Sequence, residues 1–231
     1  MNVAIVVAAG KGTRLGGNRP KQFLELGGIP VIIHTLRQFE RCHEINDVVA
    51  VLPAEETAGF QSLAQEFGLQ KLSRTVAGGE TRAQSVKNGL AAISQAEIVA
   101  VHDGVRPFVK PDEIDRVVRA AIGSGAAILV APVADTIKEI AGGRISRTLS
   151  RTDLRRALTP QCFRFDILKR AYDHLAEVEA ASIDVTDDSM LVERLGVAIV
   201  TVEGSSRNIK ITQEEDLAVA EMILKSVVSG Q

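Results

Sequence analysis

The sequence lacks tryptophan, contains a single tyrosine and has an aromatic content of only 3% over its 231 residues. Because 45% of the residues are hydrophobic, we expect one sizeable core that is packed mainly with aliphatic side chains. Cysteine is also scarce, and the two that occur, Cys42 and Cys162, do not have the spacing of metal ligands. We therefore expect two reduced thiols in a cytoplasmic protein.

Two further absences limit the partners of the chain. The net charge is only −2, so a cationic surface must be local and bulk nucleic-acid binding is not expected. No apolar run approaches the roughly 20 residues that a membrane-spanning helix needs. Met1 and Asn2 lead directly into an apolar segment, which predicts that no signal peptide is present. We expect neither nucleic acid nor a membrane as a partner.

Apolar segments and helical patterns alternate along the chain. Strands are predicted at 3–8, 47–52, 97–101, 126–131 and 197–202. Helices are predicted at 30–41, 54–67, 81–93, 111–122, 165–180, 187–195 and 213–227. This alternation is typical of an α/β fold with a doubly wound, mostly parallel sheet, here expected as a single domain over 1–231. Right-handed crossovers would place the carboxyl ends of the strands along one edge, where ligands bind.

Residues 134–151 interrupt the alternation. Two short alternating segments flank Gly142 and Gly143, which predicts a β-hairpin with a two-residue turn. A lone hairpin is only marginally stable in water, so we expect it to pack on another surface, for which a second subunit is the natural candidate. We therefore expect a dimerisation arm at about 134–158 rather than a domain boundary.

The first predicted strand ends at a glycine-rich loop that carries four cations in eleven residues. These cations are Lys11, Arg14, Arg19 and Lys21. Glycines let backbone N–H groups approach a ligand closely, and the cations indicate an anion. The loop lacks the Walker A pattern, and Gly10 and Gly12 are followed by Leu15 rather than by the third glycine of a Rossmann fingerprint. A nucleoside triphosphate site is favoured over a plain turn with solvated cations.

Later segments offer further polar groups, each with two interpretations. Gly78-Gly79 predicts a tight turn before a helix, with or without a ligand. Asp103 ends an apolar strand, which suits Mg²⁺, a ribose hydroxyl or a turn cap. Arg151 belongs to a cluster of arginines that is either a solvated face or part of a site. Thr186 precedes two acids, which is typical of a helix N-terminus but also offers a hydroxyl to a second substrate.

Five motifs occur in an order that resembles the sugar-phosphate nucleotidyltransferases. They are 8–14 (AAGKGTR) with 20–22 (PKQ), 78–86 (GGETRAQSV), 101–107 (VHDGVRP), 157–161 (ALTPQ) and 208–212 (NIKIT). With Gln22 directly after Pro-Lys, the chain most resembles the 2-C-methyl-D-erythritol 4-phosphate cytidylyltransferases of the non-mevalonate isoprenoid pathway. The resemblance covers essentially the whole chain. Gly104 stands where the family usually has alanine, a small change that a backbone contact would survive.

The resemblance implies a fold and a reaction. The fold would be a sheet of the nucleotidyltransferase type, glycosyltransferase-A-like and Rossmann-like, with a protruding hairpin arm. The enzyme would use Mg²⁺ to transfer CMP from CTP to 2-C-methyl-D-erythritol 4-phosphate, giving 4-diphosphocytidyl-2-C-methyl-D-erythritol and pyrophosphate. The acceptor phosphate would attack the α-phosphate of CTP directly. Because its second pKa is about 6, this nucleophile is already ionised near pH 7, so no general base and no histidine is required.

The resemblance also assigns residues. Arg14 and Lys21 would be catalytic by stabilising the pentacoordinate transition state. The residues that would bind CTP are Ala8, Ala9, Gly10, Lys11, Gly12, Gly79, Arg82, Ser85 and Gly104. The residues that would position the second substrate are Asp103, Arg106, Thr136, Arg151, Thr159, Thr186 and Lys210. Asp103 would also lie near Mg²⁺, which the CTP phosphates would mostly hold. In a homodimer, the arm would carry residues to the partner's site.

Other functions stay open. A ribitol 5-phosphate cytidylyltransferase shares most of these motifs, although Arg151 together with 157–161 favours the erythritol substrate. A non-catalytic nucleotide-binding protein is disfavoured because both Arg14 and Lys21 are present. A dinucleotide-dependent oxidoreductase would have to bind NAD, which we do not expect. Because the chain ends just after the last predicted helix, we expect a monofunctional enzyme.

Overall fold

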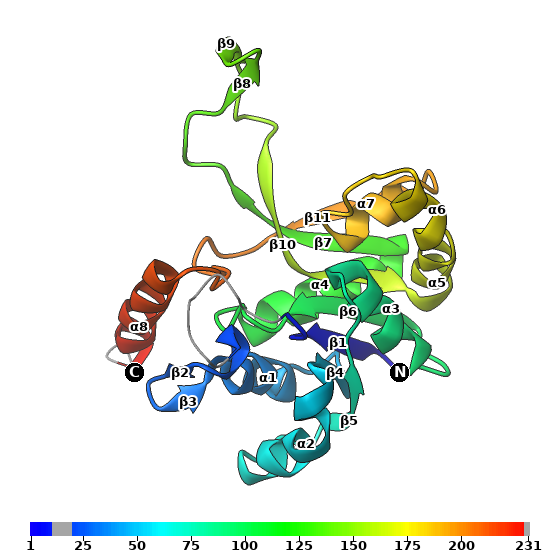
Figure 1. Cartoon of the computed structure of the whole chain (residues 1–231), viewed down its shortest axis with the longest axis vertical. Coiled ribbons are helices and arrows are strands. Elements are labelled where there is room, and N and C mark those ends of the chain that lie inside the picture. Colours follow the sequence, from blue (N-terminus) through cyan, green and yellow to red (C-terminus); the bar gives the residue numbers. More distant parts are fainter. Residues whose placement is uncertain (11–19, 229–231) are drawn as a thin grey trace.

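The computed structural model describes residues 1–10 and 20–228. Seven strands form one sheet in the order β11-β7-β10-β6-β1-β4-β5, with helices on both faces (Figure 1). Its strands are β1 (Val3–Val7), β4 (Asp47–Leu52), β5 (Leu72–Ala77), β6 (Ile98–Asp103), β7 (Ala126–Pro132), β10 (Arg155–Arg164) and β11 (Val200–Glu203). Only the pairs that involve β10 are antiparallel. The predicted doubly wound, mostly parallel α/β sheet is confirmed.

Two apolar cores lie on opposite faces of the sheet. Their helices are α1 (Val31–Arg41), α2 (Thr57–Glu66), α3 (Arg82–Ala91), α4 (Pro111–Ser124), α5 (Phe165–Asp173), α6 (Leu175–Ala180) and α7 (Asp188–Glu193). On one face, Phe39 of α1 and Ile114 of α4 pack on aliphatic side chains of the strands. On the other face, Val86 of α3 and Tyr172 of α5 do the same. Most of the buried side chains are aliphatic, as the composition predicts.

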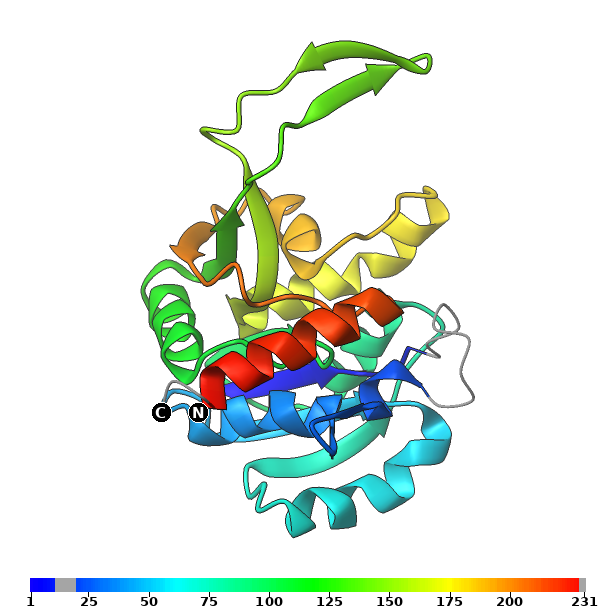
Figure 2. The ribbon, with the colours of Figure 1, turned by 90° about the vertical axis from the view of Figure 1, so that its left-hand side faces the viewer.

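A smaller third cluster lies beside the first core. It joins α8 (Glu214–Val228) to β2 (Glu25–Leu26), with Leu26, Val105 and Ala220 buried, and β2 pairs with β3 (Ile29–Pro30). Figure 2 looks onto α8, drawn in red. The short 3-10 helix η2 (Lys21–Phe23) precedes β2, so this cluster supports the segment that carries Lys21.

The sequence patterns missed two strands of the seven-stranded sheet, as well as the short pair β2 and β3. β5 lies at the edge of the sheet and exposes Ser73 and Arg74, so it has no continuous apolar run. β10 contains Pro160 and a register shift between Ala157 and Gln161, which disguises its pairing with β7. The helix predicted at 165–180 is divided into α5 and α6. The segment predicted as helix at 54–67 starts with a 3-10 turn, η3 (Ala54–Glu56), before α2.

The predicted hairpin is present as β8 (Lys138–Ala141) and β9 (Arg144–Thr148). Gly142 and Gly143 form its turn with φ values of +55° and +75°, the left-handed conformations that a two-residue hairpin turn requires. The hairpin extends away from the body, and the chain returns to the sheet at the start of β10 (Figures 1 and 2). Within residues 1–10 and 20–228, no helix is both long and apolar enough to cross a membrane.

Candidate active site

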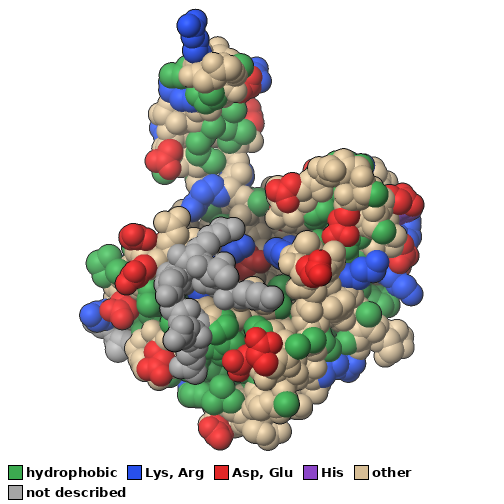
Figure 3. All heavy atoms as spheres, viewed as in Figure 1, with side chains coloured by type: hydrophobic (Ala, Val, Ile, Leu, Met, Phe, Trp, Pro, Cys, Tyr) green, Lys and Arg blue, Asp and Glu red, His purple; other side chains and the backbone are tan. Residues whose placement is uncertain are grey.

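A cavity of about 780 Å³ lies at the carboxyl ends of β1, β5 and β6. This is the sheet edge at which parallel α/β folds bind ligands. Its described lining residues are Val7, Ala8, Ala9, Gly10, Lys21, Gln22, Gly79, Glu80, Thr81, Arg82, Ser85, Asp103, Val105, Lys210 and Thr212. Figure 3 shows acidic and basic side chains gathered in the hollow at the centre of this face.

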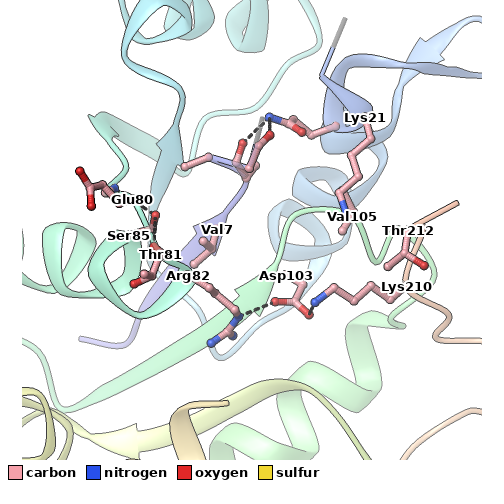
Figure 4. A pocket seen from close by; sticks show the side chains of 15 residues that line it. Val7, Lys21, Glu80, Thr81, Arg82, Ser85, Asp103, Val105, Lys210 and Thr212 are labelled. Atoms are coloured by element: carbon pink, nitrogen blue, oxygen red, sulfur yellow. Dashed lines mark hydrogen bonds and ion pairs between the residues drawn. The ribbon is translucent and has the colours of Figure 1, made fainter. Parts of the chain in front are cut away.

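One wall of the cavity is formed by the end of β1 and by η2. The side-chain amide of Gln22 is buried and donates to the carbonyls of Ala8, at 2.6 Å, and Gly10, at 3.1 Å. It therefore ties η2 to the residues that follow β1. Pro20 precedes η2, and its carbonyl accepts from Phe23 N. Lys21 projects from η2 toward the side of the cavity that carries Val105 (Figure 4).

The opposite wall is the turn between β5 and α3. Thr81 caps α3 by accepting from Gln84 N at 3.1 Å. The Ser85 hydroxyl accepts from Gly79 N at 3.1 Å and donates to the carbonyl of Thr81 at 2.9 Å. A Cβ at Gly78 would lie 2.1 Å from Ala9 Cβ, so only glycine fits this close approach. The turn predicted at Gly78-Gly79 is thus packed against the end of β1.

The carboxylate of Asp103 lies at the centre of a cationic cluster. Arg82 Nε is 3.0 Å from Oδ1, while Arg106 Nε and Lys210 Nζ are 3.2 Å and 3.1 Å from Oδ2. Figure 4 shows Arg82 and Lys210 pointing at Asp103 from opposite sides. Burial alone would raise the pKa of Asp103, but Arg82, Lys210 and Arg106 together hold it well below its usual range. Asp103 is therefore a permanent anion at neutral pH.

Arg82 also pairs with a second, fully buried acid. Its Nη2 atom donates to Asp188 Oδ2 at 2.8 Å, and the Tyr172 hydroxyl donates to Asp188 Oδ1. Burial disfavours the charged guanidinium, but Asp188 and Asp103 outweigh it and raise the pKa of Arg82 well above its usual value. Burial, followed by the charge of Asp188, raises the pKa of Tyr172. Arg82 is thus a fixed cation that joins α3, β6 and α7.

The residues behind Asp103 fix its backbone. Asp103 N donates to Thr159 Oγ1 at 3.1 Å, and Gly104 N donates to the carbonyl of Val7 at 2.8 Å. A Cβ at Gly104 would lie 2.7 Å from Ala8 Cβ. An alanine here would therefore require β1 or β6 to shift, which is a larger effect than the sequence suggested. Arg106 is held by the carbonyl of Asn208 at 2.9 Å.

The structure brings together most of the predicted residues that it describes. Those that line the cavity are Ala8, Ala9, Gly10, Lys21, Gly79, Arg82, Ser85, Asp103 and Lys210. Gly104, Arg106 and Thr159 lie behind Asp103. Thr136, Arg151 and Thr186 are exposed and are not among the lining residues. Lys11, Gly12 and Arg14 lie outside the described residues.

Two supporting residues had no predicted role in the site. Gln22 was noticed only as the end of the PKQ motif, yet its amide joins both sides of the glycine-rich loop. Asp188 was predicted only as an acid in the first turn of a helix. The N-terminal position is confirmed, because Asp187 caps α7 by accepting from Met190 N at 3.0 Å. The contact of Asp188 with Arg82 spans 106 residues of sequence, which no local pattern reveals.

Comparison with known proteins identifies the family. The sequence model of the 2-C-methyl-D-erythritol 4-phosphate cytidylyltransferases matches residues 2–226. The chain belongs to this family. A cytidylyltransferase of that name from Geobacillus kaustophilus is 44% identical over 223 residues, which cover 96% of each chain. One from Pelotomaculum thermopropionicum is 45% identical over 227 residues, which cover 96% of this chain and 94% of the relative.

Solved structures of cytidylyltransferases share the fold. The 4-diphosphocytidyl-2C-methyl-D-erythritol synthase from Anaerococcus prevotii superposes with a TM-score of 0.82 at 31% identity, covering 97% of this chain and 96% of its own. The 2-C-methyl-D-erythritol 4-phosphate cytidylyltransferase from Thermus thermophilus superposes with a TM-score of 0.76 at 33% identity, covering 97% and 100%. The resemblance indicated by the five motifs is confirmed, and the chain is a nucleotidyltransferase.

Proposed function

We propose that this chain transfers CMP from CTP to 2-C-methyl-D-erythritol 4-phosphate by direct displacement. A phosphate oxygen of the acceptor forms a bond to the α-phosphorus of CTP. The bond from that phosphorus to the bridging oxygen breaks, and pyrophosphate leaves with the electron pair. The products are 4-diphosphocytidyl-2-C-methyl-D-erythritol and pyrophosphate, and no proton has to be removed from the dianionic acceptor.

The observation that carries this proposal is the set of fixed cations around one buried carboxylate. Lys21 and Lys210 line the cavity, and Arg82 and Arg106 are held in place by Asp103. Two polyanionic substrates repel each other, and a preorganised cationic site removes that barrier and stabilises charge in the transition state. Lys21 projects into the cavity from η2, which suits a role at the α-phosphate, together with the predicted Arg14.

Asp103 is assigned to positioning rather than to base catalysis. Its pKa is far below neutrality, and a carboxylate that is already paired with Arg82, Arg106 and Lys210 is a weak proton acceptor. We propose that it orients Lys210 and Arg106 toward the acceptor. Ala8, Ala9, Gly79 and Ser85 line the cavity and are proposed to hold the cytosine base. Gly10 and the predicted Lys11 and Gly12 would bind the triphosphate.

The described residues do not form a protein-ligated metal site. Both oxygens of Asp103 are engaged by cations, and the described parts of the chain contain no group of three His, Cys, Asp or Glu side chains that could hold a metal ion. Nucleotidyl and phosphoryl transfer generally use a divalent metal bound to the nucleotide phosphates. We propose Mg²⁺ as that metal, entering with CTP rather than through Asp103.

The arm and the residues on it support a homodimer. Ile140 and Ile145 face each other across β8 and β9 and are 58% and 62% exposed, which marks an apolar surface that needs a partner. Figure 3 shows hydrophobic side chains along the arm. We propose that Thr136 and Arg151 reach the acceptor of a second subunit. Thr186 and Lys210 are proposed to act within the subunit, where Thr159 acts only through its bond to Asp103 N. The cytoplasmic location stays a prediction.

Pyrophosphate release measured with a panel of acceptors tests the reaction. With CTP and Mg²⁺, 2-C-methyl-D-erythritol 4-phosphate should support the fastest turnover, and Lys21→Ala should abolish it while CTP still binds. Faster turnover with ribitol 5-phosphate would assign the chain to that polyol instead. Binding of CTP without turnover of any acceptor would make it a non-catalytic nucleotide-binding protein.

A further inference from the structure

His102 precedes Asp103 on β6, and the proposed reaction gives it no task. Its side chain is fully buried, with its ring centroid 5.0 Å from that of Phe39 on α1. Both ring nitrogens nevertheless have polar partners. Nδ1 lies 3.0 Å from Thr159 Oγ1, and Nε2 lies 3.2 Å from the carbonyl oxygen of Arg106. A ring that is sealed from water and bonded at both nitrogens is held in one orientation.

The direction of each hydrogen bond follows from the available donors and acceptors. The carbonyl of Arg106 can only accept, so Nε2 must carry a hydrogen. Asp103 N donates to Thr159 Oγ1 at 3.1 Å, which leaves the hydroxyl hydrogen of Thr159 for Nδ1. Nδ1 then accepts, as in a neutral imidazole. Burial, opposed in part by Asp103, lowers the pKa of His102 to about 4, in agreement with a neutral ring near pH 7.

These bonds form a chain with a single direction. It starts at Asp103 N–H, passes through the hydroxyl of Thr159 and the ring of His102, and ends at the carbonyl of Arg106. Asp103 and Arg106, its two ends, are also joined by their ion pair at 3.2 Å. The chain therefore closes a ring of contacts around the turn that presents the central carboxylate.

We propose that His102 is a positioning residue for nucleotidyl transfer, acting through Thr159 and Arg106 to hold the Asp103 carboxylate among its cationic partners. The catalytic part of this inference rests on the proposed function, whereas the direction of the hydrogen bonds stands without it. Phenylalanine at 102 would fill the same space. It would leave the hydroxyl of Thr159 and the carbonyl of Arg106 without this buried partner. A buried polar group without a partner costs more free energy than the hydrogen bond itself contributes.

The first experiment needs no variant. Long-range proton–nitrogen correlation spectra of the ¹⁵N-histidine-labelled protein near pH 7 should show His102 as a neutral ring with hydrogen on Nε2 only. Thr159→Ser keeps a hydroxyl and should keep this tautomer, and Thr159→Val should shift the Nδ1 resonance. A hydrogen on Nδ1 of His102, or a charged ring, would overturn the proposal even if the protein catalysed no reaction.

The second experiment measures cytidylyl transfer. His102→Phe should lower kcat/KM for the polyol phosphate about tenfold, which corresponds to about 1.4 kcal/mol, while Kd for CTP stays within about twofold. Thr159→Val should have a similar effect, and the double variant should lose no more than either single variant, because both break one chain. His34→Phe is the matched control, since His34 also bonds a carbonyl, that of Leu26, but is bonded to neither Thr159 nor Arg106. It should leave kcat/KM unchanged.

The results of these experiments distinguish a positioning role of His102 from a purely structural one. Two results would show that His102 only supports the fold and would refute the positioning role. One is additive losses of kcat/KM in the double variant, and the other is a loss of CTP affinity as large as the loss of kcat/KM. Absence of turnover in the wild-type protein with the predicted Nε2–H tautomer present would refute the proposed function but leave the hydrogen-bond chain intact. If His102→Phe does not fold, the wild-type spectrum and the Thr159 pair still decide the matter.

Discussion

Asp103→Asn separates the two roles of the central carboxylate, as an anchor for cations and as a negative charge near the substrates. The substituted side chain would keep its size but would place an amide donor against other donors. The bond to Lys210 adds little, because that side chain is 37% exposed. The pairs with Arg82 and Arg106 involve a carboxylate that is only 8% exposed. Breaking a buried pair of this kind costs about 3 kcal/mol or more.

That loss predicts a specific pattern in thermal unfolding. For a chain of this length, about 3 kcal/mol corresponds to a fall in Tm of roughly 6–12 °C without ligand. Because the uncompensated cations then favour a polyanion, CTP should raise the Tm of Asp103→Asn by more than it raises that of the wild type. Turnover should fall at the same time, since Arg106 and Lys210 lose their common anchor.

Differential scanning fluorimetry with and without CTP, combined with pyrophosphate release, provides the assay. Asp112→Asn is the matched control, because Asp112 lies on the surface of α4 and is 3.9 Å from Arg116. An exposed pair of this kind contributes about 0–1 kcal/mol, so the control should change Tm by only a few degrees. If Asp103→Asn keeps the wild-type Tm, or is stabilised less by CTP than the wild type, the carboxylate is not the anchor of the cationic cluster.

Three further predictions concern the proposed dimer, the hydrogen bonds of Gln22 and the pH dependence of Asp103. Subunits with Lys21→Ala and subunits with Arg151→Ala, each inactive alone, should recover about one quarter of wild-type activity when mixed, and no recovery would exclude shared sites. Gln22→Glu replaces the donor to the carbonyls of Ala8 and Gly10 with an acceptor and should lower kcat/KM about tenfold. Wild-type kinetics would show that these two hydrogen bonds are dispensable. The lowered folded-state pKa of Asp103 means that its stabilisation is complete above the unfolded value of 3.8 and is lost only in stronger acid. Calorimetry should therefore show no loss of stability from this group at about pH 5–8. The value of kcat/KM should fall only below about pH 6, as the acceptor phosphate is protonated, and a loss of stability that begins above pH 5 and is absent from Asp103→Asn would contradict this.

The sequence predicted the parts of the fold that carry local patterns. β1, β4, β6 and β7 are continuous apolar runs, and their helices have clear periodicity, so strand–helix alternation led to the correct class of sheet. β10 was missed because its sequence mixes arginines at both ends, a Thr-Pro pair and only short apolar stretches. Its position between β6 and β7 depends on pairing with strands that lie far away in the sequence. Local pattern therefore could not reveal the one antiparallel strand of the sheet.

The same distinction applies to the candidate site. Gly79, Arg82, Asp103 and Lys210 were found because they lie in motifs that resemble a known family, and the structure brings them to one cavity. Motifs could not show that Asp188 pairs with Arg82, since that contact joins two helices that lie far apart in the sequence. The hydroxyl of Thr159 was predicted to face a substrate, whereas in the structure it already accepts from Asp103 N.

The antiparallel insertion of β10 has a consequence for how the chain tolerates changes in length. Both ends of the arm continue into paired strands, β7 and β10, so residues added or removed at the Gly142-Gly143 tip alter only how far the arm reaches. Between Arg155 and Gln161 the same change would displace Thr159 relative to Asp103 and turn successive side chains to the wrong face. The tip of the arm thus tolerates insertions and deletions, whereas the start of β10, to which the arm is joined, does not.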